Sequence, residues 1–181
     1  MRYVFVLVCL LMVLTASVAN AVQWTTSLTD AFGGPGYIQV VTTATDNTTY
    51  WSWSYAVTPK NGATGINALT IWLGDAKAAL VTGITVPTGW SGTVNVLPGN
   101  DSVEWRTDPN SATFNPLNAG NTFTFAFDHP WGPSASPRAS VLDSTTFIGQ
   151  VRGPSAPEPM SVLLGIMGLG SVAGFRKLRR K

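Results

Sequence analysis

The chain has 181 residues, a length typical of one domain, and charged residues make up only 11% of it, against roughly 25% in average soluble domains. Its formal charge of +2 conceals an uneven distribution, because residues 22–156 carry five Lys or Arg against eight Asp or Glu. The other basic residues lie at the two ends. This distribution argues against a basic nucleic-acid-binding face, and an aromatic content of 10% argues against a disordered polar chain.

The first 21 residues have the three parts of a secretory signal. An arginine precedes twelve consecutive apolar residues, and Ala19 and Ala21 place small side chains three and one positions before Val22. We therefore expect a signal peptide (residues 1–21) that signal peptidase cleaves between Ala21 and Val22. Cys9, the single cysteine, would be removed with it. The mature chain must then be stable without a disulfide.

The central residues, 22–152, have the pattern of antiparallel strands. Thr and other residues that favour strands are common, and short runs alternate apolar with polar side chains between turns rich in Gly, Pro and Asn. The apolar stripes are Trp51, Trp53, Tyr55 and Val57; Leu69, Ile71 and Leu73; Val103 and Trp105; and Phe123, Phe125 and Phe127. We predict an all-β domain, a single antiparallel β-sandwich of immunoglobulin or jelly-roll type, with barrel-like closure as the alternative. One helical turn or two are expected only within Asp75–Val81.

The C-terminal end contains a second signal. Residues 153–159, rich in proline, are expected to form an extended stalk that ends in Pro157, Glu158 and Pro159. Residues 160–175 carry no charge and are predicted to form a single transmembrane helix, short for a bilayer. Residues 176–181 then form a basic tail that should remain on the cytoplasmic side. Its charges are Arg176, Lys177, Arg179, Arg180 and Lys181.

This order of Pro-Glu-Pro, apolar helix and basic terminus resembles the PEP-CTERM sorting signal of Gram-negative bacteria. The resemblance covers Pro157–Lys181. It implies that the protein is a substrate of an exosortase, a protease embedded in the inner membrane, with Pro157, Glu158 and Pro159 as the recognition motif. The chain would be exported, held transiently by its helix and then passed to the cell surface or the extracellular matrix. The alternative is a permanent C-terminal anchor that is never cut.

Residues suited to catalysis are few in the central part. His129, the only histidine, precedes a proline and is expected to lie in a surface turn, and a nucleophile motif for a Ser-His-Asp arrangement is lacking. Nothing in the sequence selects a catalytic pair among the acidic residues. Zinc-ligand and phosphate-loop spacings are also absent from the sequence. We expect no enzyme activity, no metal and no cofactor.

The seven tryptophans are the feature most suited to binding. Those within alternating runs, among them Trp72 and Trp105, are expected in the core. Trp90 and Trp131 adjoin Gly or Pro in presumed loops, so they are the candidates for stacking on a ligand such as an exopolysaccharide. The sequence thus predicts a structural or adhesive protein of the envelope, exopolysaccharide or biofilm matrix, with a carbohydrate-binding module as the alternative. An enzyme with unrecognised acidic residues is the third hypothesis.

Overall fold

The computed structural model describes residues 20–74, 76–135, 138–142 and 146–155, and the expected signal residue Ala19, the Pro-Glu-Pro motif, residues 160–175 and the basic tail lie outside them. The described part is built of antiparallel strands and one short 3-10 helix. Its elements are β1 (Ala21–Asp30), β2 (Tyr37–Asp46), β3 (Trp51–Lys60), β4 (Ala68–Trp72), η1 (Ala78–Leu80), β5 (Thr82–Thr85), β6 (Ser91–Asn95), β7 (Ser102–Arg106), β8 (Phe123–His129), β9 (Pro133–Ala135), β10 (Arg138–Leu142), β11 (Thr146–Gln150) and β12 (Gly153–Pro154). Within this part, no helix combines the length and apolar character needed to cross a membrane.

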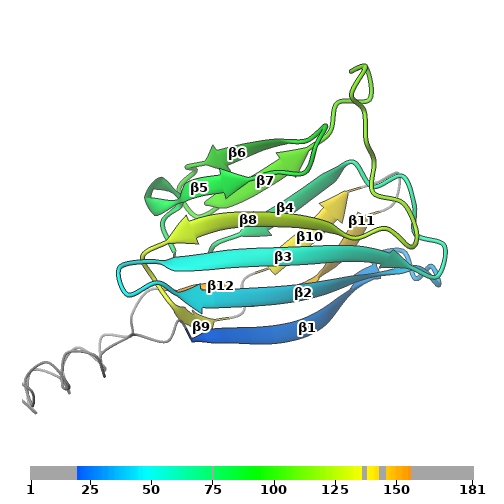
Figure 1. The fold of residues 1–181 in the computed structure, drawn as a ribbon. Helices are drawn as coiled ribbons and strands as arrows, with labels where there is room; N and C mark the ends of the chain where they lie inside the picture. The colour runs from blue at the N-terminus through cyan, green and yellow to red at the C-terminus, as the bar shows by residue number, and fades with distance from the viewer. Residues whose placement is uncertain (1–19, 75, 136–137, 143–145, 156–181) are drawn as a thin grey trace, which may run out of the picture.

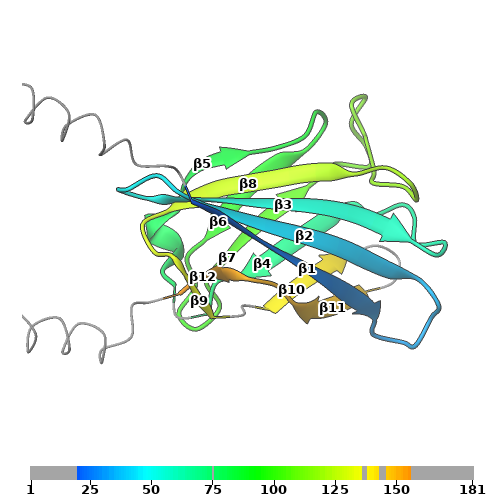
Figure 2. The same ribbon diagram turned by 60° about the horizontal axis from the view of Figure 1, so that its bottom comes forward.

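Ten strands form one sheet that curls into two layers (Figures 1 and 2). The strand order is β5-β8-β3-β2-β1-β11-β10-β4-β7-β6, and β9 and β12 pair separately. Strands β8, β3, β2 and β1 make one layer, and β10, β4, β7 and β6 make the other. The end of β1 connects the layers because Thr29 pairs with Ile148 and Asp30 with Phe147. The predicted all-β antiparallel fold is confirmed, and its two layers agree with a β-sandwich.

Aromatic side chains from the two layers meet in the core. The alternation of β3 and β8 turns Tyr55, Phe125 and Phe127 inward, where each is fully buried. Trp105 of β7 packs on all three from the opposite layer, with ring centroids 6.4, 5.5 and 6.2 Å away. Apolar burial between the layers therefore holds the fold together, as expected of a domain without disulfides.

The two edge strands of the curled sheet approach each other. Gly92 of β6 lies against Ile84 of β5, so that an added Cβ would stand 2.5 Å from Ile84 Cγ2 and 3.2 Å from Trp105 Cδ1. Among the described residues, no strand ladder joins β5 to β6. The contact between these edges is therefore made by side chains, which gives the sandwich a partly barrel-like closure.

The end of the described chain differs from the predicted stalk. Gly153 and Pro154 form β12, which pairs with β9, and both residues are buried. Val151 lies in the core. The Tyr55 hydroxyl donates a hydrogen bond to the Arg152 carbonyl over 3.2 Å, and burial raises the pKa of this tyrosine. The prediction of an extended stalk from residue 153 is wrong for Gly153 and Pro154, because strand pairing and burial fix them to the domain.

Candidate functional site

The outer face of β4, β7 and β6 gathers the polar side chains best placed to bind a ligand. Alternation along each strand turns one set of side chains into the core and the next set outward. In β7, Val103 and Trp105 are fully buried in the core, so alternation places Ser102, Glu104 and Arg106 on the other side of the strand. Ser102 is itself buried there, at 4% exposed, whereas Glu104 is half-buried and Arg106 is exposed. Each of these three has a partner in β4 and another in β6. Three rows of three side chains result, and we call them the β7 face.

Strand register defines the rows of the β7 face. The first row is Trp72, Ser102 and Asn95; the second is Thr70, Glu104 and Thr93; the third is Ala68, Arg106 and Ser91. An aromatic ring thus lies at one end, a carboxylate lies near the centre, and a guanidinium lies at the other end. Hydroxyl and amide groups occupy most of the remaining positions. This mixture suits a ligand with both an apolar side and many hydrogen-bonding groups.

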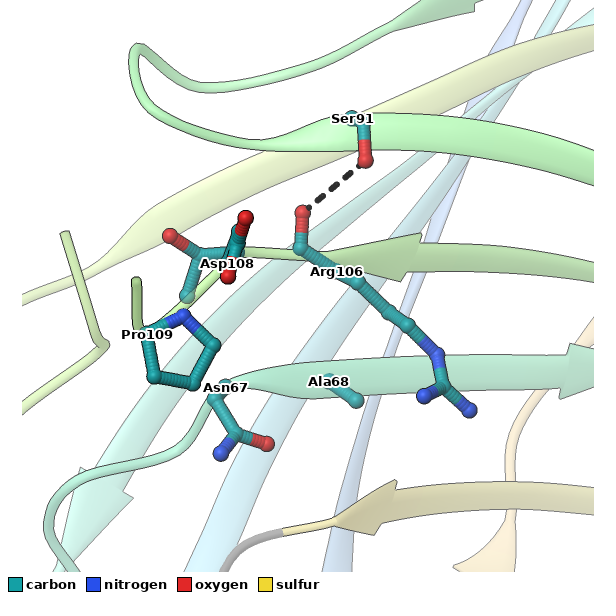
Figure 3. A pocket seen from close by; sticks show the side chains of 7 residues that line it. Asn67, Ala68, Ser91, Arg106, Asp108 and Pro109 are labelled. Atoms are coloured by element: carbon teal, nitrogen blue, oxygen red, sulfur yellow. Dashed lines mark hydrogen bonds between the residues drawn. The ribbon is translucent and has the colours of Figure 1, made fainter. Parts of the chain in front are cut away.

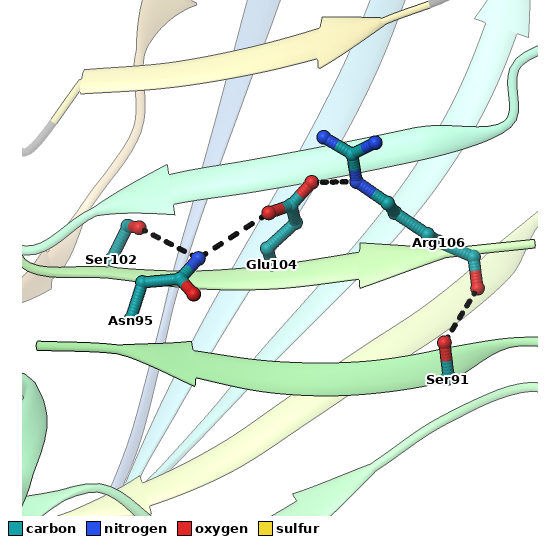
Figure 4. A network of polar contacts seen from close by, with 5 residues as sticks. All are labelled: Ser91, Asn95, Ser102, Glu104 and Arg106. Carbon is teal, nitrogen blue, oxygen red and sulfur yellow. Dashed lines mark hydrogen bonds and ion pairs between the residues drawn. The ribbon is translucent and has the colours of Figure 1, made fainter.

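A hydrogen-bonded network fixes the carboxylate at the centre of the face (Figure 4). Arg106 Nε donates to Glu104 Oε1, and the two side chains form an ion pair. Asn95 Nδ2 donates to Glu104 Oε2 over 3.3 Å and reaches Ser102 Oγ at 3.5 Å. Glu104 is 18% exposed and Arg106 64%, so both charges remain in contact with solvent. The ion pair leaves the face with balanced charge.

A hollow of about 510 Å³ opens where β7 ends (Figure 3). Asp108 and Pro109, which follow the strand, form part of its wall, and Arg106 joins it to the β7 face. The Asp108 carboxylate accepts the Asn110 amide N–H over 2.9 Å, which holds this turn. Ser91 Oγ donates to the Arg106 carbonyl over 3.2 Å across the adjacent strand pair. Asn67 and Ala68 complete the side that belongs to β4.

The prediction that Trp72 belongs to the core is wrong. Leu69, Ile71 and Leu73 are turned inward and are almost fully buried, so Thr70 and Trp72 are directed to the opposite side of β4. Trp72 is half-buried, and it is not among the residues packed against the core. The alternation of Leu69, Ile71 and Leu73 with the residues between them indicates that Trp72 lies on the outer side. The prediction of a core position followed the general preference of tryptophan for burial, which does not hold here.

Trp90 was expected to be exposed, and this expectation is also wrong. Its side chain is only 7% exposed, its ring packs edge-on against Phe125 at 4.9 Å between centroids, and its Nε1–H donates to the Asn115 carbonyl over 2.7 Å. A ring held in this way cannot stack on a ligand without leaving the core. Trp131 keeps partial exposure, although it also packs against the core and meets His129 edge-on at 5.4 Å. The structure does not bring Trp90 and Trp131 together as a platform.

His129 lies in the fold rather than in a surface turn. It ends β8 and is fully buried. Its Nδ1 accepts the Trp131 amide N–H over 3.1 Å, so its Nε2 is the nitrogen that donates to the Lys77 carbonyl over 3.2 Å. Burial lowers the pKa of His129, and the hydrogen bond to Lys77 opposes this effect in part. The surface position expected for this residue is therefore wrong.

Several acidic side chains bind backbone amides. Asp101 accepts the Ala78 N–H at 2.8 Å and the Leu97 N–H at 3.0 Å, which fixes η1 and the turn before β7. Asp30 accepts the N–H groups of Phe32 and Gly34 in the turn after β1. In the described part of the chain, no group of three acidic, His or Cys side chains lies close enough to hold a metal ion. These carboxylates therefore stabilise turns.

Comparisons with known proteins add little to this description. No protein-family model matches the chain, and no curated protein matches it. Among solved structures, the crystal structure of the KRT10-binding region domain of the pneumococcal serine-rich repeat protein PsrP is similar at 10% sequence identity and a TM-score of 0.35. That match covers 73% of this chain and 87% of the other. A likeness at this level indicates nothing about the ligand of this chain.

Proposed function

We propose that this protein is a non-enzymatic component of the cell surface or extracellular matrix, exported by its N-terminal signal and sorted by its PEP-CTERM signal. Its folded domain would have a structural or adhesive role within exopolysaccharide or biofilm. We also propose that its two layers form a sandwich of immunoglobulin or jelly-roll type. The observation that carries the functional proposal is the outer surface of the domain, where hydroxyl and amide groups predominate over charges.

The outer side of β1, β2 and β3 supports this role. Opposite the core-facing residues, these strands carry mainly Thr, Ser, Gln and small side chains, including Thr25, Thr43 and Ser54 in adjacent strands. Such a surface can form many hydrogen bonds with hydrated neutral polymers and binds few counterions. Matrix polysaccharides are polymers of this kind. The apolar core between the layers would keep such a domain folded without a disulfide.

The positions of the chain ends support sorting. The first strand begins at Ala21, one residue before the expected cleavage product begins, and the last strand, β12, ends at Pro154, three positions before Pro157. Cleavage before Val22 would remove Ala21, the first residue of β1, which pairs with Thr45, and leave the rest of the strand. A cut near Pro159 would fall after β12, which ends at Pro154. Signal peptidase, an exosortase-type protease and, transiently, the inner membrane would be the partners. Binding to exopolysaccharide would follow at the surface, and a carbohydrate-binding role is the second function we consider.

Mass spectrometry of the chain ends tests this proposal. The surface or medium form should begin at Val22 and end near Pro159. A triple variant with Ala at Pro157, Glu158 and Pro159 should remain in the membrane with its basic tail attached. Variants at Lys60 and Lys77, which change charge elsewhere, serve as controls and should be released normally. A released form that still ends in Lys181, or a chain that stays in the cytosol, would refute sorting.

A further inference from the structure

We infer that the β7 face binds a neutral polysaccharide chain, with Trp72 as the stacking ring and Glu104 and Asn95 as hydrogen-bonding groups. This inference rests on the proposed surface function, and it assigns that function a ligand and a site. The bound chain would run along β7 from Trp72 towards the hollow lined by Arg106 and Asp108 (Figures 3 and 4).

Trp72 differs from the other tryptophans in its surroundings. Trp53, Trp90 and Trp105 belong to the core, and the remaining three pack against it. Those three are Trp24, Trp51 and Trp131. Trp72 is not among the described residues that pack against the core, and none of the described ring contacts involves it. Its apolar surface therefore stays partly in contact with water, which costs about 25 cal/mol per Å². The apolar C–H face of a sugar ring could cover that surface.

Polar groups beside Trp72 can hold the hydroxyls of the same sugar or of the next one. Asn95 shares its row, Glu104 occupies the row that follows, and the buried Ser102 lies against the Asn95 amide. Asn95 and Arg106 hold the Glu104 carboxylate in place, so its orientation needs no adjustment on binding. Because a carboxylate has about four acceptor positions, these two donors leave others for ligand hydroxyls. Hydrogen bonds to an ionised group are also stronger than those between neutral groups.

Charge on the face selects among classes of ligand. Glu104 and Arg106 neutralise each other, and the other side chains of the three rows are uncharged. A nucleic acid or an acidic polymer would need unpaired cations, and the one guanidinium in the three rows is already paired. A helical peptide would need a continuous apolar stripe, whereas Trp72 is the one large apolar side chain in the rows. A neutral polymer rich in hydroxyl groups fits the face best.

The shape of the face suits a chain of several sugars. The five residues of β7 span about 13 Å, and three strands are about 10 Å wide. The hollow of about 510 Å³ extends the face beyond Arg106. A single sugar would cover Trp72 and one row only. An oligosaccharide could contact all three rows and fill the hollow.

Affinity electrophoresis of the full chain, purified in detergent, tests the inference. The probes are a neutral glucan and a galactomannan, with alginate as the acidic comparison. The wild type should be retarded by at least one neutral polysaccharide and not by alginate. Trp72→Ala should raise the dissociation constant obtained from this retardation at least tenfold, because truncation of an anchoring tryptophan removes most of its contact area. Trp72→Phe should recover part of the affinity, and Glu104→Gln should weaken binding severalfold.

Phe32→Ala is the matched control. Phe32 is 82% exposed in the turn between β1 and β2, two strands of the layer opposite to the one that carries the β7 face, so its removal should leave retention unchanged. Circular dichroism and the urea midpoint establish that each variant is folded. Unchanged retention of folded Trp72→Ala, no retention by either neutral polysaccharide, or retention by alginate alone would each overturn the inference. Mass spectrometry of the chain ends tests sorting and does not depend on these binding results. Failure of the sorting proposal and failure of the binding inference can therefore be distinguished.

Discussion

Thr42 provides a direct test of how the core is stabilised. It lies on the inner side of β2, between Trp24 of β1 and Tyr55 of β3, and it is fully buried. Its hydroxyl has no hydrogen-bond partner among the described residues. Burying a hydroxyl without a partner costs about 1–3 kcal/mol relative to one that is satisfied. Thr42→Val replaces the hydroxyl with a methyl group of similar size and keeps the branched Cβ that strands favour.

We expect Thr42→Val to raise the free energy of unfolding by about 1 kcal/mol, the lower end of that cost, because the new methyl group must still fit among aromatic rings. For a domain of this size the thermal midpoint should rise by about 3–6 °C. Urea unfolding followed by tryptophan fluorescence measures the change. The slope of the free energy of unfolding against urea concentration should be the same in the variant and the wild type.

Thr45→Val, on the outer side of the same strand, is the matched control and should change stability by less than about 0.5 kcal/mol. The reasoning fails if Thr42→Val is neutral or destabilising while the control behaves as expected. That result would mean that the hydroxyl is satisfied in solution, for example by a buried water.

Two further predictions concern other parts of the fold. Gly92→Ala should lower the free energy of unfolding, measured in urea, by about 1–3 kcal/mol because the new Cβ overlaps Ile84. Adding Ile84→Ala to this variant should recover part of the loss. Equal losses in the single and double variants would exclude this contact as the cause. Burial lowers the pKa of His129 below its ordinary value of 6.5, so the unfolded chain binds the proton more readily, and stability should fall as pH decreases below about 6.5. In urea titrations from pH 7 to pH 5, His129→Gln should reduce this decline, and an identical decline in variant and wild type would count against the assignment.

Local alternation predicted much of the fold. The inward stripe of β3, Trp53 to Val57, and that of β8 follow directly from a period of two, and both are confirmed. The same period places Trp72 on the outer face, against the usual preference of tryptophan for burial. The β7 face itself could not be predicted. It depends on the register of β4 and β6 on β7, and the β4 pairs join residues 30 or more positions apart.

The wrong predictions share a physical cause. Trp90 is buried because the Asn115 carbonyl, 25 residues later, accepts its Nε1–H. His129 is held by the carbonyl of Lys77, 52 residues earlier. Gly153 and Pro154 have a composition typical of a linker but pair with β9. In each case a distant contact overrides a local preference, and a single sequence does not reveal such contacts.

The anchoring of residues 151–155 affects when the domain can fold. Val151 fills part of the core, the Arg152 guanidinium lies 5.9 Å from the Trp24 ring, and β11 pairs with the end of β1. The first strand therefore acquires its last neighbours only after almost the whole domain has been synthesised, and such long-range pairing is slow to form. During the export proposed above, such a nascent chain would stay extended while it is threaded through a narrow translocation channel. Its architecture would then be completed on the far side.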